Sequence, residues 1–178
     1  MLALLFAGIG SNAQSSTEKK KVLVVYFSHS GNTKEIANQI KEATGADVFE
    51  IVPEKAYPTN HQAVVDLAKK EIAEGHKPAI KGKIENIEQY DMIFVGSPCW
   101  WYTIAPPVAT FLSQYDLSGK TIIPFMTHEG SRMGHSLDDI KKLCPKSTVL
   151  DGLPVRGRQV KEAKESVLKW LREIKAIK

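Results

Sequence analysis

Residues 22–33 read VLVVYFSHSGNT, a continuous apolar run that passes directly into hydroxyl residues, glycine and asparagine. An apolar residue at nearly every position is expected for a parallel strand, because helices cover both faces of such a sheet. The next segment, 33–44, places apolar residues at helical spacing, and Gly45 supplies a stop signal. We therefore expect a buried strand, a short loop and a helix as the first unit of an α/β domain.

The rest of the chain continues this alternation of short apolar runs and longer segments of helical period. Further strands are expected at 46–52, 92–95, 121–126 and 147–150, and further helices at 61–74, 108–112, 136–143 and 159–177. The alternation predicts an α/β fold with three layers: a doubly wound, five-stranded parallel sheet with helices on both faces. The spacing leaves the strand order open, but ligands of such folds bind at the carboxyl ends of strands where the order reverses.

The composition fits one soluble domain. The chain has 178 residues, 43% of them apolar and 25% charged, which suffices for one core and not for two typical domains. The net charge is +4, but the basic residues are not interleaved with aromatic ones, so nucleic-acid binding is not expected. Cys99 and Cys144 belong to no Cys-x-x-Cys motif, which argues against a metal site. Both are expected to be isolated thiols, with a disulfide as the alternative in an oxidising compartment.

Segment 1–20 is considered apart from the domain expected at 21–178. Leu2 to Ile9 is an apolar stretch too short to span a bilayer, and Ser11 and Ala13 suit a cleavage site. We expect a signal-peptide remnant or a disordered tail here. A functional signal would place the domain in the periplasm or another extracytoplasmic compartment. Without a functional signal, the domain is expected in the cytoplasm. Stable membrane insertion is not expected.

The loop after the first strand is suited to a phosphate group. Its residues are Ser28, His29, Ser30, Gly31, Asn32 and Thr33. Hydroxyls and the N–H groups of the helix start supply donors, and glycine lets the main chain approach an anion closely. The loop lacks the Gly-Lys-Ser/Thr and Gly-x-Gly-x-x-Gly patterns of nucleoside-triphosphate and dinucleotide sites. The alternative is that these residues only cap the helix.

Two later loops have the composition of a site for a flat ring. The first contains Ser97, Pro98, Cys99, Trp100, Trp101 and Tyr102, and the second contains Thr127, His128, Glu129, Gly130, Ser131 and Gly134. Adjacent aromatic residues suit the face of a ring, and small polar residues suit its edge. Successive side chains of an extended segment point to opposite sides, so the two tryptophans are not expected to stack on the same ligand.

Two further assignments have alternatives. Tyr57 is the candidate second stacking residue, or else it only pins its own loop. His128 beside Glu129 could form an acid–base pair, although a local hydrogen bond of His128 is the expected arrangement. No catalytic residue and no metal ligand is assigned.

These loops resemble those of the flavodoxin family, in which a Ser/Thr-x-Ser/Thr-Gly-x-Thr loop wraps the phosphate of flavin mononucleotide (FMN). The residues that match this pattern in register are Ser28, Ser30, Gly31 and Thr33. Residues 98–101 are similar to a Pro-x-Trp-Trp loop that lies beside the flavin ring in one subgroup, whereas His128 and Glu129 depart from the family's usual Thr-Ser-Gly-Gly-Ser form. The resemblance extends from Lys21 over nearly the whole chain and implies strand order 2-1-3-4-5 and FMN as the cofactor.

The resemblance implies an electron-transfer protein whose FMN is reduced by a partner protein or an NAD(P)H-linked reductase. One alternative is an FMN-dependent NAD(P)H oxidoreductase that acts on quinones or similar acceptors, which steady turnover with NADH or NADPH would reveal. A second alternative is a non-redox module that binds another phosphate ester, which a chain unable to retain flavin would support.

Overall fold

The computed structural model describes residues 20–178, so the expected signal peptide lies outside the described residues. Within 20–178, no helix combines the length and the apolar character needed to cross a membrane.

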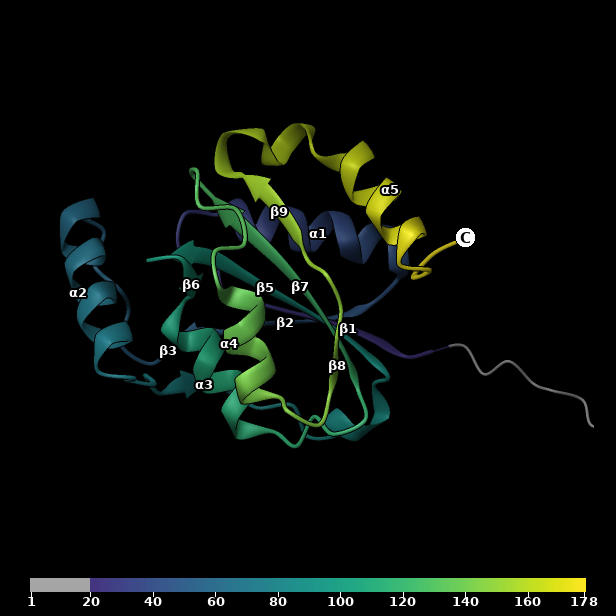
Figure 1. Ribbon diagram of the computed structural model, residues 1–178, viewed down its shortest axis with the longest axis horizontal. Coiled ribbons are helices and arrows are strands. Elements are labelled where there is room, and N and C mark those ends of the chain that lie inside the picture. The colour runs from purple at the N-terminus through teal and green to yellow at the C-terminus, as the bar shows by residue number, and fades with distance from the viewer. Residues whose placement is uncertain (1–19) are drawn as a thin grey trace, which may run out of the picture.

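The described chain folds around one mostly parallel sheet (Figure 1). Its parallel strands are β1 (Val22–Tyr26), β2 (Asp47–Glu50), β5 (Met92–Trp100), β7 (Thr121–His128), β8 (Thr148–Val149) and β9 (Leu153–Arg156). The order is β2-β1-β5-β7-β8, with β9 paired to the far end of β7 and the short β6 (Thr103–Ile104) antiparallel to β5. The expected doubly wound fold and the order 2-1-3-4-5 are confirmed, with the fifth position divided between β8 and β9.

Helices cover both faces of the sheet and enclose a core on each side. Helices α1 (Asn32–Thr44) and α5 (Lys164–Glu173) lie on one face, and α3 (Pro106–Gln114) and α4 (Ser136–Leu143) lie on the other (Figure 1). Side chains of β1 alternate between the two cores: Val24 and Tyr26 pack on the α1–α5 side, and Leu23 and Val25 on the other. The burial of β1 on both faces explains its unbroken apolar sequence.

Strand β5 extends further than its apolar run predicts. Residues 96–100 were expected to form a loop, but they pair with β7 as far as Pro98 and then with β6. Glycine is required at position 96, because a Cβ there would lie 2.2 Å from the Phe125 ring of β7. Cys99 therefore lies in a strand and not in a loop, and it and Cys144 are free thiols.

Two other predicted elements are divided. The expected strand 46–52 breaks at Ile51, after which β3 (Val52–Pro53) pairs with β4 (Ile80–Lys81), which was not predicted. The expected helix 159–177 is a 3-10 segment, η2 (Gly157–Glu162), followed by α5. An apolar spacing of three residues, as at Val160 and Ala163, occurs in both helix types, so the sequence pattern does not reveal the break.

Helix α2 (His61–Ala73) lies at one end of the molecule, where it contacts α3 and β5 (Figure 1). Asn60 caps it by accepting a hydrogen bond from the Ala63 N–H at 3.0 Å. The buried residues of α2 are Val64 and Ala68, so the helix packs against the rest of the domain through a narrow apolar face. The remaining described helix is a 3-10 turn, η1 (Ile87–Gln89), before β5.

Candidate functional site

A cavity of about 590 Å³ lies at the carboxyl ends of β1, β5 and β7. This volume is within the usual range of small-molecule sites. The predicted residues that line it are His29, Ser30, Asn32, Pro98, Cys99, Trp100, Trp101, Tyr102, Thr127, His128, Glu129, Gly130 and Ser131. The predicted residues outside its lining are Ser28, Gly31, Thr33, Tyr57, Ser97 and Gly134. The three loops therefore converge on one cavity, as the topology requires.

The first loop, residues 28–33, forms a turn that leads into α1. The Ser28 hydroxyl accepts a hydrogen bond from the Gly31 N–H at 3.1 Å. Gly31 has φ of 90°, a conformation that favours glycine, and it occupies the N-cap position of α1, where no side chain accepts a capping hydrogen bond. The main-chain N–H groups of the first turn thus remain available for an anion. The alternative in which the loop only caps the helix is not supported.

Thr33 has a structural role in the first loop. Its hydroxyl shares a hydrogen bond of 2.8 Å with the hydroxyl of Thr127 at the end of β7. Both side chains are buried, and Thr127 also lines the cavity. The pair fixes the distance between the first loop and the loop that follows β7.

The aromatic hairpin, residues 98–104, is a tight turn with bulky residues in an uncommon conformation. Trp100 and Thr103 are paired across the hairpin, and the two residues between them, Trp101 and Tyr102, have φ of 48° and 66°. Positive φ at both positions is the geometry of a type I′ turn, which usually contains Asn and Gly. Such a conformation costs a bulky residue on the order of 1–3 kcal/mol and persists only when the surroundings enforce it.

Neighbouring residues enforce this turn from behind. The His135 N–H donates to the Tyr102 carbonyl oxygen at 2.8 Å. A Cβ at Gly134 would lie 2.1 Å from the same oxygen, so glycine is required there for close approach. Ser97 acts similarly: its buried hydroxyl accepts the Ala105 N–H at 2.8 Å. Gly134 and Ser97, which were predicted as cofactor contacts, support the hairpin and lie outside the cavity lining.

Trp100 is the centre of an aromatic cluster at the cavity wall. Its ring meets the rings of Tyr57, Phe27 and His29 edge to face, with centroid distances of 5.0, 5.5 and 5.9 Å. The Tyr57 hydroxyl donates to the Glu71 carboxylate at 2.5 Å. Burial, together with this carboxylate, raises the pKa of Tyr57 far above its usual range. Tyr57 therefore lies behind Trp100, which favours the packing role over the stacking role.

Trp101 lies differently from Trp100 because it belongs to the turn of the hairpin and not, as was expected, to an extended segment. It is 43% exposed, and its indole N–H donates to the Val65 carbonyl oxygen of α2 at 3.0 Å. The Lys69 ammonium lies 4.9 Å from the ring centroid, in cation–π geometry. Trp101 thus joins the hairpin to the loosely attached helix α2.

The last residues of β7 and β9 hold buried polar atoms without partners among the described residues. His128 Nδ1 and Arg156 Nε have no hydrogen-bond partner among the described residues. Burial lowers the pKa of His128, and the nearby charges of Arg132 and Arg156 lower it further. Arg156 donates through its terminal nitrogen to the Glu129 carbonyl oxygen at 3.2 Å. The expected local hydrogen bond of His128 is absent from residues 20–178, and so is any bond from it to Glu129 that would support an acid–base pair.

The Cys99 thiol is half-buried at the cavity wall, where burial raises its pKa. A raised pKa favours the thiol over the thiolate, which is the nucleophilic form.

Several lining residues were not predicted from the sequence. They are His61, Val64, Val65 and Ala68, all on α2. Val64 and Ala68 are four residues apart, which is also the pattern of an ordinary core face, so the sequence carries no signal that distinguishes a cavity wall. Gly157 was also missed: a Cβ there would lie 2.2 Å from Glu129 Oε1 and 2.6 Å from Asn32 Nδ2. The start of η2 therefore closes against two of the predicted loops.

The cavity has two chemically distinct ends. At the first loop it offers the uncapped start of α1 beside Ser30 and Asn32, which fits a phosphate group. Towards α2 it offers Trp100 and the apolar side chains of Val64 and Ala68, which fit a flat apolar body. His128, the last residue of β7, also lines the cavity, and its unpartnered Nδ1 is buried behind this wall. A phosphate ester of a large aromatic ring fits this donor set.

Comparison with known proteins points to one family. A family model described as flavodoxin matches residues 21–174. A protein described as a flavoprotein from Bacteroides eggerthii is 32% identical, with a TM-score of 0.75, over 89% of this chain and 99% of that one. One from Bacteroides uniformis is 28% identical, with a TM-score of 0.77, over 87% and 99%. A flavoprotein from Lactobacillus acidophilus, solved in complex with FMN, is 28% identical, with a TM-score of 0.66, over 80% and 97%. No curated protein matches the chain.

Proposed function

The chain belongs to the flavodoxin family, and from this premise we propose that it binds one FMN and transfers electrons through it to or from a partner. The observation that carries the proposal is the convergence of an uncapped helix start and an aromatic hairpin on a single cavity of about 590 Å³. The similar Lactobacillus acidophilus flavoprotein was solved with FMN, which supports the choice of cofactor.

The phosphate is assigned to the first loop. Its ligands would be the N–H groups of the first turn of α1, the Ser30 hydroxyl and the Asn32 side chain, while Ser28 holds the turn through Gly31. The loop itself contains no Lys or Arg. Arg156, which adjoins Gly157 at the edge of the same region, supplies the neighbouring positive charge. Main-chain donors therefore do most of the binding, as is usual for anions at helix starts.

The ring is assigned to the space between the aromatic hairpin and α2. When bound, FMN supplies one- and two-electron transfer chemistry, and the protein supplies orientation, exclusion of water and electrostatic tuning. Trp100 is held by its aromatic cluster and offers a fixed wall, and Val64 and Ala68 exclude water from the opposite wall. Burial, together with the nearby charges of Arg132 and Arg156, lowers the pKa of His128 and so favours its neutral form.

The test is an absorption spectrum of the purified chain after mixing with FMN and removing free flavin. We expect retained flavin bands and quenched flavin fluorescence, and reduction by a chemical reductant or a flavodoxin reductase. A chain that retains no flavin would overturn the proposal and favour a module for a different phosphate ester.

The alternative is an FMN-dependent NAD(P)H oxidoreductase acting on quinones or similar acceptors. The apolar wall formed by Val64, Val65 and Ala68 favours it, because a flat acceptor could lie against such a surface. Rapid steady-state turnover with NADH or NADPH and a quinone, without a reductase, would establish this alternative. Reduction of the flavin only through a partner reductase would support electron transfer.

A further inference from the structure

A second cavity, of about 380 Å³, lies between α2, β6, α3 and α4. It shares no lining residue with the cofactor cavity. The apolar part of its lining consists of Ile72, Ile104, Pro106, Ala109 and Leu143. The volume is at the lower end of the range for small-molecule sites, which suits a ligand smaller than a nucleotide.

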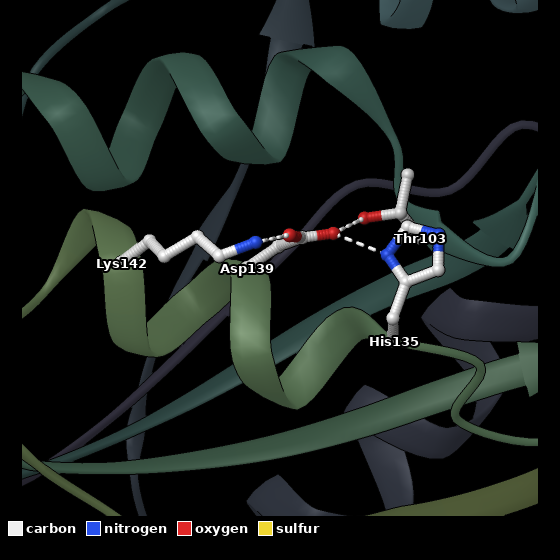
Figure 2. A network of polar contacts seen from close by, with 4 residues as sticks. All are labelled: Thr103, His135, Asp139 and Lys142. Carbon is white, nitrogen blue, oxygen red and sulfur yellow. Dashed lines mark hydrogen bonds and ion pairs between the residues drawn. The ribbon is translucent and has the colours of Figure 1, made fainter.

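One side of this cavity carries a polar network centred on Asp139 (Figure 2). The Thr103 hydroxyl donates to Asp139 Oδ2 at 2.6 Å, and His135 Nδ1 lies 2.6 Å from the same oxygen. The Lys142 ammonium donates to Oδ1 at 3.0 Å. Both oxygens of the carboxylate are therefore engaged within the protein, and its charge is balanced by Lys142.

The hydrogen-bonding capacity that remains in this lining consists mainly of donors. Lys142 has two further N–H groups, whereas Nε2 of His135 is an acceptor when its Nδ1–H donates to Asp139. His76 and Lys77 also line the cavity, and no ion pair joins either of them to another described residue. The other carboxylate of the lining, Glu71, accepts the Tyr57 hydroxyl. A ligand that complements this lining must offer acceptors.

We propose that the second cavity binds a small organic carboxylate with an apolar body, such as an aromatic or branched aliphatic acid. The carboxylate group would be held by Lys142 and Lys77, because charge-assisted hydrogen bonds are the strongest that these donors can make. The apolar body would cover Ile104, Ala109 and their apolar neighbours.

The occupant of this cavity would contact residues that also support the cofactor cavity. Thr103 directly follows the hairpin residue Tyr102, and the His135 N–H holds the Tyr102 carbonyl oxygen. Glu71 holds Tyr57, which packs on Trp100. The second cavity is therefore placed directly behind the wall that carries the aromatic hairpin.

The experiment is an NMR titration of the isotope-labelled full chain with benzoate, in the presence and absence of FMN. We expect saturable shifts of main-chain amides within 71–77, 103–109 and 135–143, under both conditions. Benzyl alcohol, which has the same ring without the charge, should bind at least tenfold more weakly. A chain that fails to bind FMN would still report on this cavity, so the two proposals fail separately.

Matched variants locate the site. Lys77→Gln combined with Lys142→Gln should weaken benzoate binding at least tenfold. The control, Lys70→Gln combined with Lys141→Gln, removes the same charge from exposed positions of α2 and α4 outside the lining and should change the affinity less than twofold. Ala109→Leu, which fills the apolar floor, should abolish binding. Equal affinities of the two double variants, shifts confined to 98–102 and 127–131, or no saturable shifts would overturn the proposal.

Discussion

The first loop and the aromatic hairpin line the same cavity, but their conformations are stabilised in different ways. Residues 28–33 are small and polar, and the one position with positive φ, Gly31, is a glycine. The hairpin places Trp101 and Tyr102 at positive φ and depends on His135, Gly134 and α2 to hold them there. The first loop is thus determined by its own sequence, whereas the hairpin is determined by distant residues. Mutations should therefore affect the two regions differently.

The largest expected effect is on the cluster behind the hairpin. Trp100→Ala removes the ring that Tyr57, Phe27 and His29 contact, and should lower the free energy of unfolding by about 3 kcal/mol. Trp101→Ala removes one indole hydrogen bond and a cation–π contact of an exposed ring, and should cost about 1 kcal/mol. Urea denaturation of the two variants measures the difference. Equal losses would mean that the two tryptophans do not have the separate roles described above.

The second effect concerns the first loop. Gly31→Val forces a β-branched residue into φ of 90°, at a cost of about 1–3 kcal/mol, and displaces the donors at the start of α1. We expect FMN affinity to fall by about 10- to 100-fold in a fluorescence titration. Gly119→Val is the matched control, because Gly119 has φ of 75° and open space around its Cβ position but lies outside the cavity lining, and it should bind FMN normally. If both variants bind alike, the first loop is not the phosphate site.

The third effect tests the link between the first loop and β7. Thr33→Val and Thr127→Val each leave a buried hydroxyl unpaired and should each destabilise the fold by about 1–2 kcal/mol. The double variant removes both hydroxyls, so its loss should be smaller than the sum of the single losses. A double-mutant cycle by chemical denaturation gives the coupling, and additive losses would show that the hydroxyl pair contributes no interaction energy.

The smallest effect is a pH dependence from His128. Burial and the nearby arginines lower its pKa in the folded chain, so below about pH 6.5 the unfolded chain binds a proton that the folded chain resists. The stability of the folded chain is therefore not reduced by His128 above the ordinary histidine pKa. It falls as the pH drops below that value, because the unfolded chain then takes up the proton more readily. Between pH 7.5 and 5.5 the loss from this residue should be less than about 1 kcal/mol, because the side chain is not fully buried. His128→Gln should flatten the profile by that amount, and an unchanged slope would contradict the assignment.

The sequence predicts those elements whose signals are local. The strand, first loop and helix over 22–44 follow from one buried run, one hydroxyl-rich turn and one glycine stop, and the structure contains all three. The extension of β5 through residues 96–100 could not be predicted in this way. Gly96 and Pro98 weaken the strand signal, and the reason for glycine lies in Phe125 of another strand. The residue types at such positions depend on tertiary contacts, which the local sequence does not reveal.

The site shows the same division. Its lining loops were predicted from composition and topology, because parallel strands bring their carboxyl ends together. The wall from α2 was missed because Val64 and Ala68 have the spacing of any buried helix face. The support roles of Ser97 and Gly134 were missed because both residue types are equally common in ligand-binding loops and in tight turns.

The most direct test of the account is a parallel titration of the purified chain with FMN and with riboflavin, followed by flavin fluorescence. Riboflavin has the same ring and lacks the phosphate, so it can use the aromatic hairpin but not the first loop. The account predicts that both flavins bind and that FMN binds at least 100-fold more tightly. Equal affinity for the two flavins, or no binding of either, would contradict the claim that the two regions hold the two ends of one FMN.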